Sequence, residues 1–454
     1  MSIFATHRTL IAAFSIILWL SGVAASAQLQ TPPGPPQAPA ANENFIVTFR
    51  PGTSQADRAA SVRRAGATLR FNYSVVDAVA ITANGNAIGA LQRDITVLEI
   101  IPDRSVQAFQ AGQGNGNGRG PGGGGGGGGG GSSQVVPEGV KRVGPPTSSS
   151  NGSDIGVAIV DTGIDLVHAD LQGGLGASSY SSFGGSCQDD NSHGTHVAGI
   201  VGARDNTIDV LGVAPNSTLY CVKVLNAAGS GSDSDVMAGL DWVYANRNLV
   251  SPNIRVINMS LGRTGTLDDN PPLRASVRAL QDAGIAVVVA AGNDSSKEVS
   301  QMIPAGYPEV FAVASTAAIS GSNAGCKFFS GTIPADTASY FTTDGAFDVG
   351  SGIGVTISAP GEDKEDVNKP CFIKSSGILS LKLGGGTTRM SGTSMASPHV
   401  AGVVARMMQA GTSNVETIRT NLRQNADGTG VAPLGSPASG YTPDGEQEGI
   451  AQAP

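Results

Sequence analysis

The chain has 454 residues, of which 40% are hydrophobic, and a formal net charge of −8. This length predicts two to three domains. Charged residues make up only 14% and form no basic stripe, which argues against nucleic acid as a partner and against a chain too highly charged to fold.

Residues 1–27 have the features of a secretory signal. Arg8 supplies the positive start, the apolar run 10–20 is short for a membrane span, and Ala25 to Ala27 form a small-residue cleavage site. An uncleaved anchor is the alternative. No later segment is long and apolar enough to cross a bilayer, so a secreted protein without a stable membrane span is expected.

Export predicts an oxidising compartment, so the four cysteines are expected to form two disulfides. Four cysteines allow three pairings. Proximity along the chain favours Cys187–Cys221 and Cys326–Cys371. The sequence contains no CxxC pair that would indicate a zinc site.

The first half of the chain divides by composition. Residues 28–42 form a Pro- and Ala-rich leader, and residues 43–108 predict a small α+β domain, marginal in stability at that size. Its expected strands cover 44–50, 75–81 and 95–101, with a helix around 59–65. Residues 109–132 are a linker, because the glycine run 122–131 cannot hold a fixed shape.

Residues 133–425 alternate short apolar runs with helix-like segments. Such continuous Val/Ile/Ala runs are typical of parallel strands buried on both faces, and the intervening helices predict an α/β layered fold. The runs are 156–160, 219–225, 255–259 and 286–290. Residues 426–454 are rich in Gly, Pro and Ala and are expected to form a flexible tail.

Asp161 ends the first of these runs, in Val157 to Gly163. The carboxyl ends of strands are where α/β folds build their sites, so this carboxylate is a catalytic candidate. A capping role is the alternative. Asp165 lies past the turn and is the weaker candidate, and His168 is expected to be a surface or packing residue.

His193 opens a predicted helix within Asn191 to Gly199. Histidine is the commonest general base because its pKa lies near neutrality. A metal pair with His196 is the alternative, but no HExxH glutamate accompanies it. Asp189 and Asp190 could serve as ligands or belong to a solvated loop.

Ser394 lies in the stretch Gly392 to His399, which predicts a tight turn opening a helix. Pro398 is expected in the first turn of that helix. Free N–H groups and the helix dipole favour negative charge beside such a serine, as a nucleophile requires, although an ordinary N-cap is the alternative. Asn293 follows the run 287–289, and its amide could donate to an oxyanion or simply form a turn.

Asp161, His193 and Ser394 occur in the chain order known for subtilisin. The motifs 160–165, 193–199 and 392–399 together resemble a subtilisin-type secreted serine endopeptidase over about residues 133–425. The resemblance implies a doubly wound, mostly parallel sheet. It implies that Asp161 orients the base His193, that Ser394 is the nucleophile, and that Asn293 and the Ser394 N–H form the oxyanion hole.

The same resemblance assigns the substrate edges and the inhibitor. Two segments would pair with an extended peptide substrate, namely Gly229, Ser230 and Gly231, and Ser260, Leu261 and Gly262. Ordinary loops are the alternative. Residues 43–108 would be the propeptide, an intramolecular inhibitor and chaperone, removed by a cut between about 105 and 135. Asp233, Asp294 and Glu298 could favour basic substrate residues.

A structural calcium ion is a further implication of the resemblance. Its ligands would be Gln134, Asp170 and Asn206, with the backbone carbonyls of Arg204, Ile208 and Val210. Oxygen-only ligands suit calcium. No catalytic metal or organic cofactor is expected. The protein is expected to be a monomer. The other candidates are a catalytically silent binding protein that kept the fold and a serine esterase, although the usual Gly-x-Ser-x-Gly elbow does not surround Ser394.

Overall fold

The computed structural model describes residues 42–109, 133–329, 331–428 and 448–454. The predicted signal, most of the leader and the glycine run lie outside these residues. Within them, no helix combines the length and the apolar character needed to cross a membrane.

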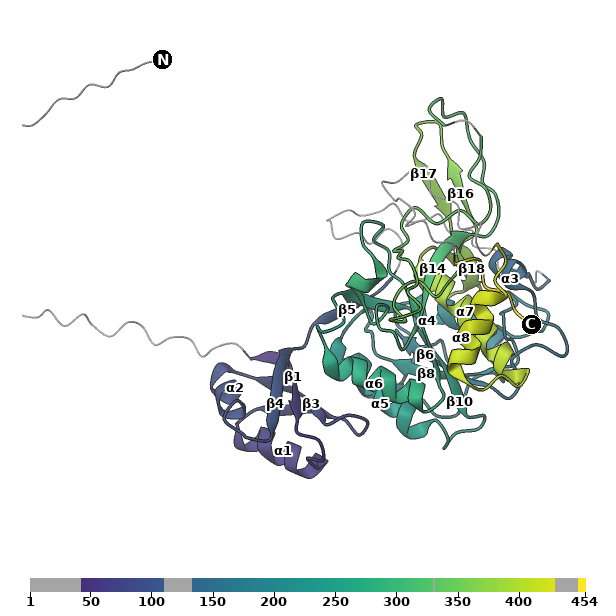
Figure 1. Ribbon diagram of the computed structural model, residues 1–454. Coiled ribbons are helices and arrows are strands. Elements are labelled where there is room, and N and C mark those ends of the chain that lie inside the picture. The colour runs from purple at the N-terminus through teal and green to yellow at the C-terminus, as the bar shows by residue number, and fades with distance from the viewer. Residues whose placement is uncertain (1–41, 110–132, 330, 429–447) are drawn as a thin grey trace, which may run out of the picture. The chain divides into compact units, whose positions relative to one another are not determined.

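The small region near the N-terminus is one antiparallel sheet with two helices (purple and blue in Figure 1). Its strand order is β2-β3-β1-β4. The elements are β1 (Glu43–Phe49), α1 (Gln55–Arg64), β2 (Thr68–Asn72), β3 (Ala78–Ala83), α2 (Gly85–Leu91) and β4 (Val97–Pro102). The three predicted strands are present, the second and third beginning two to three residues later than expected, whereas β2 and α2 were not predicted.

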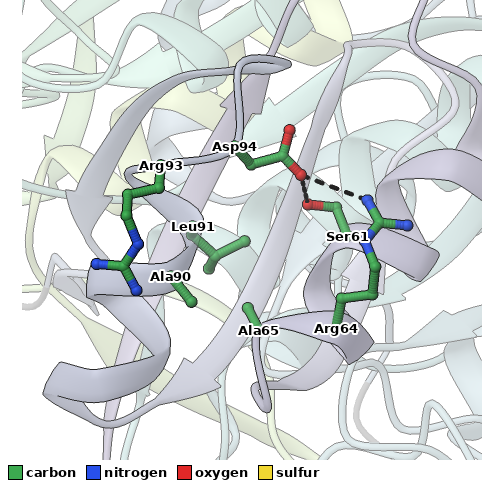
Figure 2. A pocket seen from close by; sticks show the side chains of 7 residues that line it. All are labelled: Ser61, Arg64, Ala65, Ala90, Leu91, Arg93 and Asp94. Atoms are coloured by element: carbon green, nitrogen blue, oxygen red, sulfur yellow. Dashed lines mark hydrogen bonds and ion pairs between the residues drawn. The ribbon is translucent and has the colours of Figure 1, made fainter.

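Helices α1 and α2 enclose a hollow on the outer side of this sheet (Figure 2). Asp94 lines this hollow, where it accepts a hydrogen bond from Ser61 and forms an ion pair with Arg64. Arg93 extends on the opposite side of the hollow. The Ser61–Asp94 hydrogen bond and the Arg64–Asp94 ion pair connect α1 to the residues that follow α2, and no histidine or cysteine lines this hollow.

The large region is built on a seven-stranded sheet of order β15-β14-β12-β10-β6-β8-β7. Each neighbouring pair is parallel. The strands are β6 (Gly156–Asp161), β7 (Tyr180–Ser181), β8 (Thr218–Lys223), β10 (Ile254–Met259), β12 (Ala286–Ala290), β14 (Phe311–Ala317) and β15 (Ile357–Glu362). The predicted parallel α/β sheet is therefore confirmed.

Helices cover both faces of this sheet (Figure 1). Along β6, Val157 and Ile159 belong to the apolar cluster that includes α4 (His193–Gly202) and α7 (Thr393–Gln409). Ala158 and Val160 point into the opposite cluster, formed with α5 (Asp233–Asn246) and α6 (Pro271–Asp282). Alternate residues of one strand thus face two cores, as the apolar run predicted. Two further helices are α3 (Glu138–Val143) and α8 (Val415–Gln424).

Both predicted disulfides are confirmed, Cys187–Cys221 and Cys326–Cys371. The second joins Cys326 to Cys371, which lies in the turn between the hairpin strands β16 (Lys364–Val367) and β17 (Ile373–Ser376). A second hairpin, β18 (Ile378–Leu381) and β19 (Thr387–Met390), precedes the turn at Gly392.

The expectation of a flexible tail over 426–454 is wrong for residues 448–454. Ile450 is fully buried and exchanges two backbone hydrogen bonds with Asp427. The Ala451 N–H donates to the Ser358 carbonyl on β15. Two apolar side chains and this backbone pairing hold a segment that composition alone marked as loose.

Candidate active site

The end of β6 and the start of α4 bring Asp161 and His193 together. The His193 Nδ1 lies 2.7 Å from Asp161 Oδ1, and both side chains are fully buried. The Nδ1–H donates to the carboxylate, which leaves the other ring nitrogen available as a base. His193 Nε2 has no hydrogen-bond partner in the part of the chain that the structure describes.

Ser394 lies at the second position of α7, directly after the turn at Gly392, whose φ is +150°. Pro398 is the sixth residue of this helix, so its expected place in the first turn is wrong. Without an N–H, Pro398 leaves the Ser394 carbonyl without its helical donor. The Ser260 hydroxyl supplies that bond at 2.8 Å, and Ser394 Oγ donates in return to the Ser260 carbonyl at 2.9 Å.

The Ser394 hydroxyl is therefore bonded to Ser260 rather than to His193. Catalytic hydrogen bonds commonly form only when substrate is aligned. The Ser260 carbonyl also accepts the Phe109 N–H, at 3.3 Å, so this carbonyl links the serine to the chain segment lying in the cleft.

Asn293 follows β12 and faces the start of α7. Its Oδ1 accepts hydrogen bonds from both the N–H and the hydroxyl of Thr393, at 3.0 and 2.9 Å. Its Nδ2 is buried and has no partner among the described residues. Thr393 thus fixes the direction of the amide, a role that sequence reasoning missed because a threonine before a serine is an ordinary helix start.

The other histidines among the described residues are structural. His196 Nε2 lies 3.0 Å from the Ile378 carbonyl, and burial lowers the pKa of His196 to about 3. Burial also lowers the pKa of His399 to about 4. His168 is buried and accepts the Asp170 N–H. Within the described ranges, no group of three His, Cys, Asp or Glu residues could hold a metal ion, so the alternative of a histidine metal pair has no support.

The two predicted substrate edges lie on either side of β5 (Ser105–Ala108), the end of the small region. β5 pairs antiparallel with β9 (Ser230–Ser232) and with β11 (Leu261–Thr264), and β13 (Met302–Ile303) extends the sheet. The Ala108 N–H donates to the Gly229 carbonyl at 2.9 Å. An extended segment of this chain thus occupies both edges by main-chain bonds.

Two of the three acidic groups expected near the substrate, Asp233 and Asp294, are paired with cations. Asp233 is fully buried, and Arg263 lies 2.6 Å from its carboxylate. Burial raises the pKa of Asp233, an effect that Arg263 opposes. Asp294 pairs with Lys297. These contacts remove the basis for a basic-residue preference at Asp233 and Asp294.

The residues expected to hold calcium meet around one side chain. Three oxygens converge on the Gln134 amide nitrogen, namely the Arg204 carbonyl, the Val210 carbonyl and Asn206 Oδ1. Asp170 is fully buried and accepts bonds from the Asn206 amide and the Val210 N–H. Burial raises the pKa of Asp170 to about 6. Ile208 lies in the same loop, where its N–H donates to Asn206.

Comparison with known proteins agrees with this geometry. Residues 152–447 match the model of the Subtilase family, Peptidase_S8. The chain belongs to the subtilase family. Subtilisin E of Bacillus subtilis (strain 168) is 32% identical over 81% of this chain and 80% of its own length. M-protease of Shouchella clausii (strain KSM-K16) is 37% identical over 66% of this chain and 67% of its own.

Among solved structures, fervidolysin from Fervidobacterium pennivorans, a keratinolytic enzyme related to subtilisin, has the same fold. Its TM-score is 0.63 at 20% identity, and the match covers 91% of this chain and 60% of that one. This subtilase is thus a doubly wound α/β protein and a serine-type endopeptidase.

Proposed function

We propose that this subtilase cleaves peptide bonds through an acyl-enzyme on Ser394. The observation that carries the proposal is that two buried polar atoms, His193 Nε2 and Asn293 Nδ2, have no hydrogen-bond partner within the described ranges. Buried polar atoms are normally satisfied, so each such exception needs an explanation. A proton acceptor and an oxyanion donor are the two groups that an acyl transfer needs.

The reaction would proceed in two balanced steps. Ser394 Oγ bonds to the substrate carbonyl carbon as His193 Nε2 takes the hydroxyl proton, while Asp161 stabilises the imidazolium. Asn293 Nδ2 and the Ser394 N–H donate to the oxyanion. His193 then gives the proton to the leaving amine. In the second step water attacks the acyl carbon, His193 takes a proton from the water and gives it to Ser394 Oγ, and the carboxylic acid product leaves.

Residues 43–108 would act as an intramolecular inhibitor whose last strand fills the cleft. β5 runs toward Ser394 and ends where Phe109 donates to Ser260, the carbonyl that Ser394 also contacts. The peptide bond after Phe109 is therefore the one presented for cleavage. A Cβ added at Gly262 would approach the Phe109 ring to 2.8 Å, so the glycine makes room for an aromatic side chain.

Secretion completes this proposal. The signal at 1–27 directs export, and two disulfides are typical of an oxidising compartment. Subtilisin relatives support the same route. The protein would be made as a zymogen and recovered outside the cell without residues 1–109.

The test compares wild type with Ser394→Ala and a neighbouring control, Ser391→Ala. Wild type and the control should react with a fluorophosphonate and digest casein, whereas Ser394→Ala should do neither and should retain the small region. N-terminal sequencing of mature wild type should begin at residue 110. Equal casein digestion by wild type and Ser394→Ala would refute the mechanism, and a start elsewhere would refute only the assigned bond.

A structural calcium ion fits the oxygens around Gln134. Rotation of its amide would exchange the nitrogen for an oxygen, which would join the Arg204, Val210 and Asn206 oxygens and the carboxylate of Asp170 as ligands. Such a donor set suits calcium, which would stabilise the loop and take no part in the reaction. We expect a lower melting temperature in a chelator, restored by calcium. An unchanged melting temperature would count against the site.

A further inference from the structure

Asp189 carries an unusual number of hydrogen bonds for one buried carboxylate. Only 3% of the residue is exposed, and its two oxygens accept five bonds. Oδ1 accepts from the Thr162 hydroxyl at 2.9 Å, the Asn191 N–H at 2.9 Å and the Ser192 N–H at 3.1 Å. Oδ2 accepts from the N–H and the hydroxyl of Thr195, at 2.9 and 2.5 Å.

These donors belong to two segments of the chain, one carrying Asp161 and the other carrying His193. Thr162 directly follows Asp161 at the end of β6. Asn191 and Ser192 lead into α4, and Thr195 lies in its first turn beside His193. The Thr162 hydroxyl also accepts the Gly194 N–H at 2.9 Å, which closes the connection between strand and helix.

The start of α4 depends on Asp189 for a second reason. Ser192 is the N-cap residue, yet its φ is +94° and its side chain makes no capping bond. Asp189 instead accepts the Thr195 N–H in the first turn and the N–H groups of Asn191 and Ser192 just before it, and its negative charge lies favourably at the helix N-terminus. No ion pair with a lysine or arginine is formed by this carboxylate in the described part of the chain, so neutral hydrogen-bond donors stabilise its charge.

We propose that Asp189 is a positioning residue, which holds the His193 ring at hydrogen-bond distance from Asp161. The proposal rests on the proposed roles of Asp161, His193 and Ser394. It replaces the two expectations for this residue, a metal ligand or a member of a solvated loop. Asp189 touches neither β9 nor β11, so its loss should slow the chemical step without weakening the binding of substrate.

The test is Asp189→Asn, which preserves size but turns one acceptor into a donor facing other donors. A misplacement of about 1 Å costs on the order of 100-fold in rate, so kcat should fall about 100-fold with KM changed less than about threefold. The low-field proton NMR signal of the His193–Asp161 hydrogen bond should move or broaden. Asp190→Asn is the matched control, because Asp190 is half exposed and the asparagine keeps an oxygen for Lys223.

A second variant, Thr162→Val, keeps the test decisive if Asp189→Asn does not fold. It breaks only the connection to the strand and leaves the helix contacts of Asp189 in place. The two changes together should cost less than the sum of their separate effects. The proposal is overturned if a folded variant retains wild-type kcat, or loses kcat while the NMR signal is unchanged. Ser394→Ala in the same series separates this outcome from failure of the proposed mechanism.

Discussion

The small region and the large region of this subtilase are stabilised in different ways. The large region has two extensive apolar clusters on the two faces of its sheet and both disulfides. The small region has one core of its own, formed by eight buried residues. These are Val47, Phe49, Val62, Val79, Ile81, Ala83, Ala87 and Leu91. A domain of this size is marginal without help.

That help comes from the other face of its sheet. Alternate residues of β3 point in opposite directions, with Val79 and Ile81 in the small core and Ala78 and Ala80 in the cluster shared with α5 and α6. Ile46 on β1 joins the same shared cluster. The small sheet is therefore buried on both faces, and the burial of one face depends on contact with the large region.

Polar contacts also join the small region to the large region, at the start of α5. Asp103 accepts the N–H and hydroxyl of Ser234 at 2.9 and 2.6 Å, and Arg70 at 2.8 Å. The Tyr73 hydroxyl donates to the Ser234 carbonyl at 3.0 Å. A domain stabilised this way loses much of its support once it is detached, which suits its proposed role as an inhibitor that must be displaced.

Equivalent core substitutions in the two regions should show the largest difference in how the two regions are stabilised. Ile81→Ala and Ile257→Ala each remove a fully buried side chain and should each cost about 2–5 kcal/mol. For the small region this is comparable to its whole stability, roughly 3–10 kcal/mol at its length. In a Ser394→Ala background, Ile81→Ala should unfold the small region and open the cleft. Ile257→Ala should only lower the melting temperature.

Hydrogen exchange followed by mass spectrometry distinguishes the two results. In Ile81→Ala, protection should vanish in β1 and β3 and fall in β5, while β6 and β10 stay protected. If both variants lose protection over the whole molecule together, the two regions unfold as one unit and the contrast is wrong.

The sequence predicted the large sheet because its strands are apolar on both faces, as parallel strands must be. Asp161 and Asn293 were identifiable for the same reason, since each follows such a run. In the small region the pattern was weaker. β2 alternates Leu69 and Phe71 with Arg70 and Asn72 over only five residues and is at most partly buried, so its apolar signal was too short to identify a strand.

Other features depended on partners far away in the sequence. The Ser394 carbonyl receives its bond from Ser260, 134 residues away, so the position of Pro398 could not be read from the local motif. Asp189 receives a hydrogen bond from Thr162, 27 residues away, so the local motif left both a metal ligand and a solvated loop open for it. Ile450 and Ala451 gave too short an apolar signal to reveal their pairing with residues 427 and 358.

The smallest expected effect concerns the hollow of the small region at low pH (Figure 2). Hydrogen bonds from Ser61 and Thr96 lower the pKa of Asp94 from 3.8 to about 2. A carboxyl with a lowered pKa stabilises the fold fully above its unfolded value and loses that contribution as pH falls toward its folded value. Asp94→Asn should therefore destabilise the small region at pH 5, and its difference from the parent should shrink between about pH 4 and pH 2.

The measurement is hydrogen exchange in β1 and β3 of the full-length Ser394→Ala chain at pH 5 and pH 2.5, each compared with the same chain carrying Asp94→Asn. Asp57→Asn is a suitable control, because Asp57 is exposed and lies near the other end of α1. A difference between Asp94→Asn and its parent that is as large at pH 2.5 as at pH 5 would show that the carboxylate charge is not what stabilises the hollow. The shrinking difference would instead assign the acid sensitivity of the small region to Asp94, on the face that the large region does not support.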